Sequence, residues 1–169
     1  MWFIITFLKI FKYNINYYIM NFIENIENCI SSLNGRISWN EYFMSISLLV
    51  SCRSCCERLH VGCVIVDKDN HIVSVGYNGF LAGAPHTSRV RDNHEQSTVH
   101  AEQNAISYAA KCGVSVNNCI AYISHYPCIN CAKILASSGI KQIYYHNDYK
   151  NDTFVCDILK DAGVKIERI

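Results

Sequence analysis

Residues 119–139 of the chain read CIAYISHYPCINCAKILASSG, and this stretch decides the fold class. Its first part, Cys119–Ser124, is an apolar run of strand length, and the part from Cys128 to Ser138 predicts a helix. Pro127 is tolerated in a first helical turn, and Gly139 is a typical helix end. A strand that runs directly into a helix favours an α/β sheet covered by helices.

Segments on both sides of this stretch continue the alternation. The strands Val61–Val66 and Ile72–Tyr77 predict a hairpin joined by the turn Asp67–Asn70, and a long loop, Asn78–Val99, follows. The other expected elements are a helix that Ser38 caps together with Glu41, a helix from about His100 to Lys111, a strand at Ile140–Tyr145, a helix at Thr153–Ala162 and a strand at Val164–Ile169. The chain is therefore predicted to be an α/β protein.

The pattern of a metal site is formed by His100, Cys128 and Cys131. Two cysteines three positions apart at a helix start lie on one face and can converge on one ion. The positive end of the helix dipole favours their thiolate form, which is the form that binds metal. Two thiolates and one imidazole fill three of the four tetrahedral positions that zinc favours, and the fourth is left for water. An open position is typical of a catalytic zinc.

Glu102 follows His100 by two residues and is placed to act beside the open position rather than as a fourth ligand. Zinc lowers the pKa of bound water to roughly 7, and a nearby carboxylate can carry the proton of that water to a leaving amine. A structural zinc site would need a fourth protein ligand and would have no use for this carboxylate. The combination matches the signature of the zinc nucleobase deaminases and predicts a hydrolytic deaminase.

Length, charge and cysteine content narrow the class of protein. The chain has 169 residues, half of them hydrophobic, which fits one globular domain with a real core. Its formal charge is +1 without a run of lysine and arginine, so polymeric nucleic acid is not expected as a substrate. Ten cysteines without a secretory signal favour a reducing, cytoplasmic location over a disulfide framework.

The N-terminal part differs from the rest. The run Trp2–Leu8 is almost wholly apolar, but it is shorter than the about 20 residues of a membrane helix. We therefore expect residues 1–36 to be an extension rather than a membrane anchor, with Met20 as an alternative start. Residues 37–169 are expected to form the deaminase domain.

The sequence resembles the deoxycytidylate deaminases, one branch of the zinc deaminase superfamily, over most of Ile37 to Val164. The resemblance is carried by Arg53-Ser54-x-Cys56-Glu57-Arg58-Leu59-x-Val61-Gly62, Gly76-Tyr77-Asn78-Gly79, Thr98-Val99-His100-Ala101-Glu102-x-Asn104-Ala105-Ile106, Pro127-Cys128-x-x-Cys131-Ala132-Lys133, Ser138-Gly139-Ile140-Lys141 and Asp148-Tyr149. It implies a three-layer α/β/α sandwich with a mixed central sheet of about five strands. It also implies hydrolysis of dCMP to dUMP and ammonia, which supplies dUMP for thymidylate synthesis, in a homo-oligomer, such as a hexamer, that dCTP activates and dTTP inhibits.

The same resemblance assigns roles in substrate binding. Asn78 would hydrogen-bond the deoxyribose, and the backbone amide of Ala101 would meet the pyrimidine carbonyl. A monophosphate needs a cation, for which Arg53 and Arg58 are the candidates, with Arg53 preferred and Tyr149 as a hydroxyl donor at the far rim.

A second, structural zinc is a further implication of the resemblance, with Cys56, His86 and His94 at or beside the matching positions. Thr87 and Glu95 stand where related sequences often have cysteine, so the ligand set departs from the pattern. A structural zinc should have four ligands.

Other readings stay open at this point. Deaminases of free cytosine, cytidine or deoxycytidine, of tRNA adenosine and of riboflavin precursors use the same zinc chemistry. A tRNA enzyme should be basic and salt-sensitive, which a net charge of +1 does not favour, and a nucleoside enzyme would not need Arg53. The alternative outside enzymes is a zinc-stabilised binding protein, against which Glu102 argues.

Overall fold

The computed structural model describes residues 21–92 and 94–169, and the side chain of His94 also lies outside the described part. The chain divides into two compact units, residues 1–37 and residues 38–169. In the first unit, residues 21–31 are helical. The apolar run Trp2–Leu8 and Met20, which the sequence singled out, lie outside the described residues. The roles of the two parts stay a prediction.

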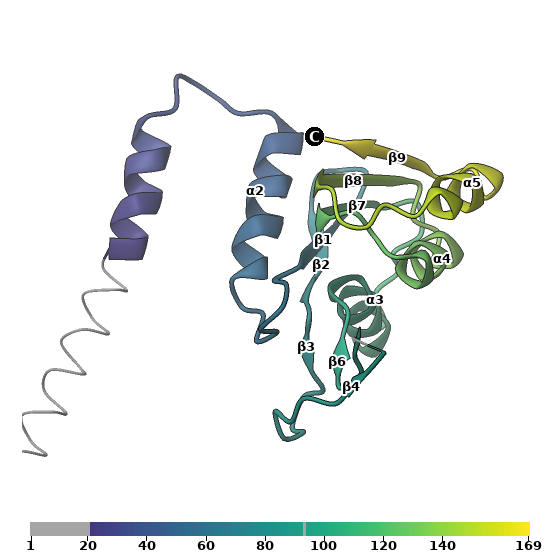
Figure 1. The fold of residues 1–169 in the computed structure, drawn as a ribbon. Helices are drawn as coiled ribbons and strands as arrows, with labels where there is room; N and C mark the ends of the chain where they lie inside the picture. The colour runs from purple at the N-terminus through teal and green to yellow at the C-terminus, as the bar shows by residue number, and fades with distance from the viewer. Residues whose placement is uncertain (1–20, 93) are drawn as a thin grey trace, which may run out of the picture. The chain divides into compact units, whose positions relative to one another are not determined.

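The second unit is built around one five-stranded sheet (Figure 1). Its strands are β1 (Gly62–Val66), β2 (Ile72–Tyr77), β7 (Ile120–His125), β8 (Gln142–Asn147) and β9 (Lys165–Arg168), in the order β2-β1-β7-β8-β9. β1 is antiparallel to both β2 and β7, whereas β7, β8 and β9 are parallel to one another. The sheet is therefore mixed, and the expected fold class is confirmed.

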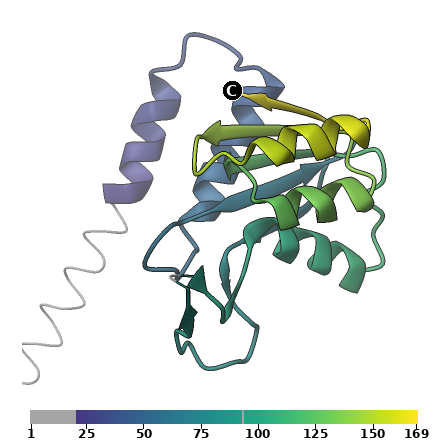
Figure 2. The same cartoon turned by 45° about the vertical axis from the view of Figure 1, so that its right-hand side comes forward.

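Helices cover both faces of the sheet, which makes three layers. On one face lies α2 (Trp39–Ser51), whose first turn carries the predicted capping box between Ser38 and Glu41. The other face is covered by α3 (Ala101–Lys111), α4 (Ile129–Ser137) and α5 (Thr153–Asp161), which Figure 2 shows one above the other in front of the sheet.

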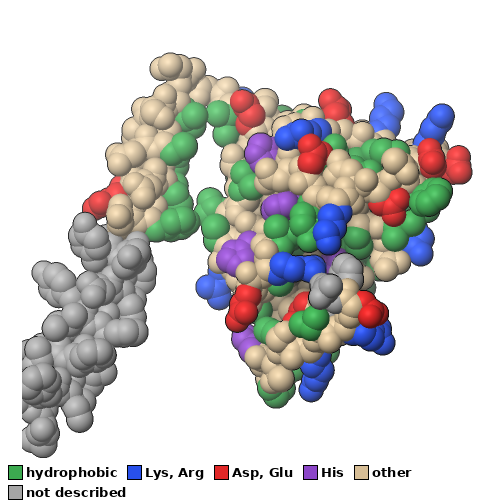
Figure 3. All heavy atoms as spheres, viewed as in Figure 1, with side chains coloured by type: hydrophobic (Ala, Val, Ile, Leu, Met, Phe, Trp, Pro, Cys, Tyr) green, Lys and Arg blue, Asp and Glu red, His purple; other side chains and the backbone are tan. Residues whose placement is uncertain are grey.

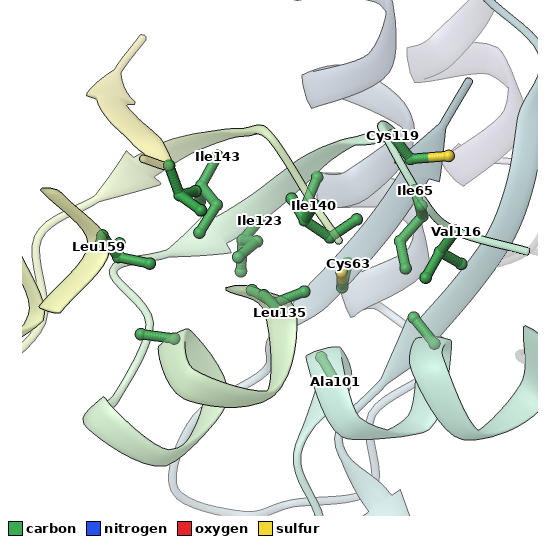
Figure 4. Packing of buried hydrophobic residues seen from close by; sticks show 14 of the residues in the cluster. Cys63, Ile65, Ala101, Val116, Cys119, Ile123, Leu135, Ile140, Ile143 and Leu159 are labelled. Atoms are coloured by element: carbon green, nitrogen blue, oxygen red, sulfur yellow. The ribbon is translucent and has the colours of Figure 1, made fainter. Parts of the chain in front are cut away.

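The alternation of side chains along the strands divides the core between these two layers. In β1, Val64 and Val66 pack with Phe43 and Met44 of α2. Cys63 and Ile65 of the same strand point to the opposite layer, where they pack with residues of α3, α4 and α5 (Figure 4). All five residues of β1 are buried, as expected for a strand covered on both faces.

The segment expected to be a loop between Asn78 and Val99 contains four strands of two residues each. β3 (Gly79–Phe80) pairs with β6 (Thr98–Val99), and β4 (Val90–Arg91) pairs with β5 (His94–Glu95). Two residues are too few to show an alternating pattern, so no periodicity in the sequence indicates these strands. Within residues 21–92 and 94–169, no helix has the length and apolar character needed to cross a membrane.

Candidate active site

The N-termini of α3 and α4 bring the three expected metal ligands together. His100 and Cys128 are the residues immediately before the two helices, and Cys131 lies in the first turn of α4. Nδ1 of His100 is 3.4 Å from Sγ of Cys131 and 3.6 Å from Sγ of Cys128. One ligand atom from each residue lies within 4.8 Å of the other two, and this is the one such group of three found among the described side chains.

This donor set fits zinc. Tetrahedral zinc holds nitrogen at about 2.0 Å and sulfur at about 2.3 Å, which separates a nitrogen from a sulfur ligand by about 3.5 Å. The two observed nitrogen–sulfur distances lie within 0.1 Å of that separation. Three protein ligands leave the fourth position of a tetrahedron free, as in catalytic zinc sites.

The electrostatics of the cysteine pair also favour metal binding. A hydrogen bond from Cys131 lowers the pKa of the Cys128 thiol to about 4, and a further hydrogen bond with His100 acts in the same direction. The same hydrogen bond with Cys128, together with burial, raises the pKa of Cys131. The pair therefore shares one proton, which a metal ion bound by both sulfurs would displace.

Glu102 lies in the first turn of α3 and is 4% exposed. Burial raises the pKa of its carboxyl group above the usual value, and the negative charge of Cys128 adds to this effect. A carboxyl group whose pKa is shifted towards neutrality can both accept and return a proton near pH 7. Buried carboxylates are rare outside functional sites, so the position of Glu102 is itself informative.

Contacts with β2 fix the position of α3. An added Cβ at Gly76 would lie 2.3 Å from the carbonyl oxygen of Ala101 and 2.5 Å from the backbone nitrogen of Ala105, so only glycine lets the helix approach this closely. The hydroxyl of Ser74 donates to the carbonyl oxygen of Ala105 at 2.7 Å, and Nδ2 of Asn104 donates to that of Tyr77 at 2.7 Å. These contacts set where His100 and Glu102 stand.

The turn before α4 is held by strands on both sides of β7. Ser124 accepts a hydrogen bond at Oγ from the backbone nitrogen of Gly62 in β1, at 3.0 Å. From β8, Nδ2 of Asn147 donates to the carbonyl oxygen of Ser124 at 3.2 Å, and the carbonyl oxygen of Asn147 accepts from the backbone nitrogen of Tyr126 at 2.8 Å. Cys128 follows directly, so its place is set by the sheet.

A cavity of about 470 Å³ opens beside these residues. Volumes between about 300 and 1,000 Å³ are typical of small-molecule sites. Of the residues predicted from sequence, the ones that line it are His100, Ala101, Glu102, Cys128, Asn78, Tyr149, Arg58 and Cys56. Sequence reasoning missed His125, which also lines the cavity.

The two candidate arginines differ in position. Arg58 lines the cavity, whereas Arg53 is not among the lining residues and lies exposed just past the end of α2. Arg58 also acts on His100 electrostatically, lowering its pKa, although the hydrogen bond with Cys128 raises it more. The cavity therefore favours Arg58 over the arginine that the sequence preferred.

Asn78 is buried and has a structural task in addition to facing the cavity. Its Oδ1 accepts from the backbone nitrogen of Val61 at 2.7 Å, and its Nδ2 donates to the carbonyl oxygen of Leu59 at 2.8 Å. The side chain thus holds the segment that precedes β1. One hydrogen of Nδ2 and one lone pair of Oδ1 remain for a ligand, because a primary amide has two of each.

Two of the three residues suggested for a second zinc share a smaller cavity. Cys56 and His86 line a pocket of about 340 Å³, in which the His86 ring stacks on Phe80 at a centroid distance of 4.9 Å. The side chain of His94 lies outside the described part of the chain. Glu95 also lines this pocket, but its carboxylate accepts from the backbone nitrogens of Arg89 and Ser97 and from the hydroxyl of Ser88.

A family model for the cytidine and deoxycytidylate deaminase zinc-binding region matches residues 37–147. The chain belongs to this deaminase family. Two relatives illustrate the similarity. ComE operon protein 2 of Bacillus subtilis is 43% identical over 138 residues, which cover 79% of this chain and 72% of the relative. The deoxycytidylate deaminase of Schizosaccharomyces pombe is 34% identical over 145 residues, but the match spans only 44% of that protein.

A solved structure of the family has the same fold. The dCMP deaminase of the cyanophage S-TIM5, in complex with dCMP and dUMP, superimposes with a TM-score of 0.71 at 33% identity. The match covers 80% of this chain and all of that one. The region shared with the family is a zinc-binding region, in agreement with the group formed by His100, Cys128 and Cys131.

Proposed function

We propose that this protein is a zinc-dependent deaminase that hydrolyses dCMP to dUMP and ammonia. The observation that carries the proposal is the buried carboxylate of Glu102 beside a three-ligand metal group, in a cavity that an arginine also lines. The similarity to the S-TIM5 dCMP deaminase supports dCMP as the substrate.

Zinc would be held by His100, Cys128 and Cys131, and when bound it supplies a water activated at neutral pH and a positive charge beside the reacting carbon. Hydrolysis replaces the amine on C4 of the pyrimidine with the oxygen of water. Glu102 would carry one hydrogen of that water to N3 of the ring and the other to the amine nitrogen, so that ammonia leaves and the carboxylate ends in its starting state. A carboxyl pKa raised by burial suits both transfers.

The rest of the cavity would orient the nucleotide. The backbone amide of Ala101, at the start of α3, would donate to the pyrimidine carbonyl, since the first amides of a helix have no partner within the helix. Asn78 would contact the deoxyribose through the hydrogen of Nδ2 and the lone pair of Oδ1 that its bonds to Leu59 and Val61 do not use. Tyr149 would contribute its hydroxyl at the rim.

Arg58 is the proposed cation for the phosphate. A phosphate is recognised by a guanidinium group through charge and paired hydrogen bonds, and Arg58 lines the cavity whereas Arg53 does not. The two residues therefore form a matched pair for mutagenesis. Arg58→Ala should raise KM for dCMP at least about tenfold, the weight of a hydrogen bond to a charged group, and Arg53→Ala should not.

The experiment that tests the proposed chemistry is Glu102→Gln. This variant keeps the size of the side chain but cannot carry a proton, and general acid–base catalysis contributes about 10²- to 10⁴-fold to a rate. We expect the rate of ammonia release from dCMP to fall at least about 100-fold. The zinc content, measured by elemental analysis, should stay at one ion per chain. Full turnover by this variant would overturn the assignment.

Other parts of the proposal concern assembly, regulation and location. We expect a homo-oligomer in the cytoplasm whose activity responds to dCTP and dTTP. Light scattering and rate measurements during titration with both nucleotides test this, and a monomer with an unchanged rate would contradict it. A second, structural zinc near Cys56 and His86 would appear as two zinc ions per chain in elemental analysis.

A further inference from the structure

His125 is among the polar side chains of the cavity that have no part in the chemistry described so far. His125 ends β7, lies three residues before Cys128 and is half-buried. It lines the same cavity as Glu102 and Tyr149. Its ring meets that of Tyr149 edge to face, with centroids 6.4 Å apart and planes at 89°.

The hydrogen bonds around His125 favour one of its two neutral tautomers. Nδ1 lies 3.0 Å from Oγ of Ser124, a residue that is 1% exposed. Oγ of Ser124 accepts from the backbone nitrogen of Gly62, which can only donate. A buried hydroxyl hydrogen needs an acceptor, and Nδ1 of His125 lies within hydrogen-bonding distance of Oγ. We therefore assign Nδ1 as the acceptor and Nε2 as the nitrogen that carries the hydrogen.

The environment keeps this imidazole neutral. Burial lowers the pKa of His125, and the nearby His146 adds to the effect. Nε2–H is therefore a fixed donor rather than a group that gains charge near neutral pH. Since Ser124 is held by β1 and Asn147 of β8 holds its carbonyl oxygen, the ring is oriented before any ligand arrives.

The residues that line the cavity differ in exposure, which bears on what this donor would meet. Ala101 and Glu102 are buried, whereas the ligands His100 and Cys128 are exposed, as are Arg58 and Asn130, and His125 and Tyr149 are intermediate. A nucleotide whose base reaches the buried Glu102 can direct its charged phosphate towards exposed residues such as Arg58. A phosphate oxygen is the strongest hydrogen-bond acceptor of a nucleoside monophosphate, because it carries the charge.

We propose that His125 is a specificity-determining residue that donates a hydrogen bond from Nε2 to the phosphate of the substrate and so distinguishes a nucleotide from a nucleoside. The proposal rests on the function proposed above. Arg58 supplies the charge, and His125 supplies a second donor that lines the same cavity.

The test compares binding of the products dUMP and deoxyuridine to the zinc-loaded protein by calorimetry. His125→Phe keeps a ring against Tyr149 but removes the donor, and His125→Gln keeps an N–H close to the position of Nε2. We expect His125→Phe to weaken dUMP binding about 10- to 100-fold, the weight of a hydrogen bond to a charged group, and to leave deoxyuridine within about twofold. We expect His125→Gln to retain most of the affinity for dUMP.

His71→Gln is the matched control, because His71 lies in the exposed turn between β1 and β2 and contacts Asp67. Equal weakening of dUMP and deoxyuridine binding by His125→Phe would overturn the phosphate contact.

Nitrogen NMR of the imidazole provides a second readout. The wild-type ring should carry its hydrogen on Nε2, and a hydrogen on Nδ1 would refute the donor assignment. Failure of the wild-type protein to prefer dUMP to deoxyuridine would instead contradict the proposed function itself.

Discussion

Replacing Gly76 with alanine tests how the sheet positions the catalytic helix. The added Cβ would stand 2.3 Å from the carbonyl oxygen of Ala101, where ordinary contact begins at 3.4 Å. Both this atom and the nitrogen of Ala105 belong to backbone, so no side chain can rotate away. The start of α3, with His100 and Glu102, must therefore move by about 1 Å, since the gap has to open by that amount.

Two effects of different size follow from this displacement. Overpacking a core contact typically costs about 1–3 kcal/mol of unfolding free energy. A displacement of about 1 Å at the reacting groups can cost about 100-fold in rate. We therefore expect Gly76→Ala to remain folded but to lose about two orders of magnitude in kcat for dCMP.

Gly79→Ala is the control, because a Cβ there meets only the Tyr77 ring and Sγ of Cys55, at 3.4 and 3.6 Å. Urea denaturation gives the unfolding free energy of both variants, and ammonia release gives kcat. A Gly76→Ala protein with unchanged stability and with kcat within twofold of wild type would refute the claim that β2 sets the position of Glu102.

Three further predictions concern the metal, the segment before β1 and the loop at the second pocket. Removing zinc with a chelator should abolish turnover. It should also lower the unfolding free energy by about 4 kcal/mol relative to a sample that contains zinc at about 1,000 times its Kd. An unchanged melting temperature would show that the three ligands hold no metal. Asn78→Ala leaves the backbone groups of Leu59 and Val61 without a partner and should cost about 1–3 kcal/mol in urea denaturation, whereas an unshifted midpoint would mean that these hydrogen bonds contribute nothing. Hydrogen bonds from Ser88, Arg89 and Ser97 lower the pKa of Glu95 to about 2, so its contribution to stability is present above the ordinary carboxyl pKa and is lost as the pH falls towards 2. Proteolysis of the loop at decreasing pH should show this loss in the wild type but not in Glu95→Gln, and equal pH dependence of the two would contradict it.

Much of the fold and the metal group could be predicted because the signals are local. Within one short stretch, a strand is followed by a proline and the start of a helix, which predicts both elements. The two cysteines three positions apart in the same stretch predict a pair of metal ligands. His100 and Glu102, at the start of the preceding helix, could be predicted from their spacing alone. In the structure His100, Cys128 and Cys131 lie close together, as expected for two thiolates and one imidazole that bind one metal ion. Some strand boundaries in the structure differ from the predicted ones by one or two residues. β8, for example, begins at Gln142 rather than at Ile140.

The substrate side of the cavity depended on contacts distant in sequence. The orientation of His125 comes from Gly62 through Ser124, across 62 positions of the chain, and no spacing pattern indicates such a bond. The choice between Arg58 and Arg53 depends on the path of an irregular segment, where neither helical nor strand periodicity says which side chain faces inward.

Surface charge bears on the alternative of a nucleic-acid substrate. On the face shown in Figure 3, lysine and arginine side chains are interspersed with aspartate, glutamate and hydrophobic ones rather than gathered in a stripe. With a net charge of +1, this pattern does not favour an enzyme that follows a phosphate backbone. A small nucleotide remains the substrate that suits the cavity.

The measurement that tests the central claim most directly is ammonia release by the purified, zinc-loaded protein from dCMP, deoxycytidine and dCTP at equal concentration. We predict turnover that is selective for dCMP, because Glu102, the proposed zinc ligands His100 and Cys128 and the proposed phosphate donors Arg58 and His125 all line one cavity. Preference for deoxycytidine would keep the zinc chemistry but contradict the phosphate site formed by Arg58 and His125. Absence of turnover with all three would contradict the assignment as a dCMP deaminase.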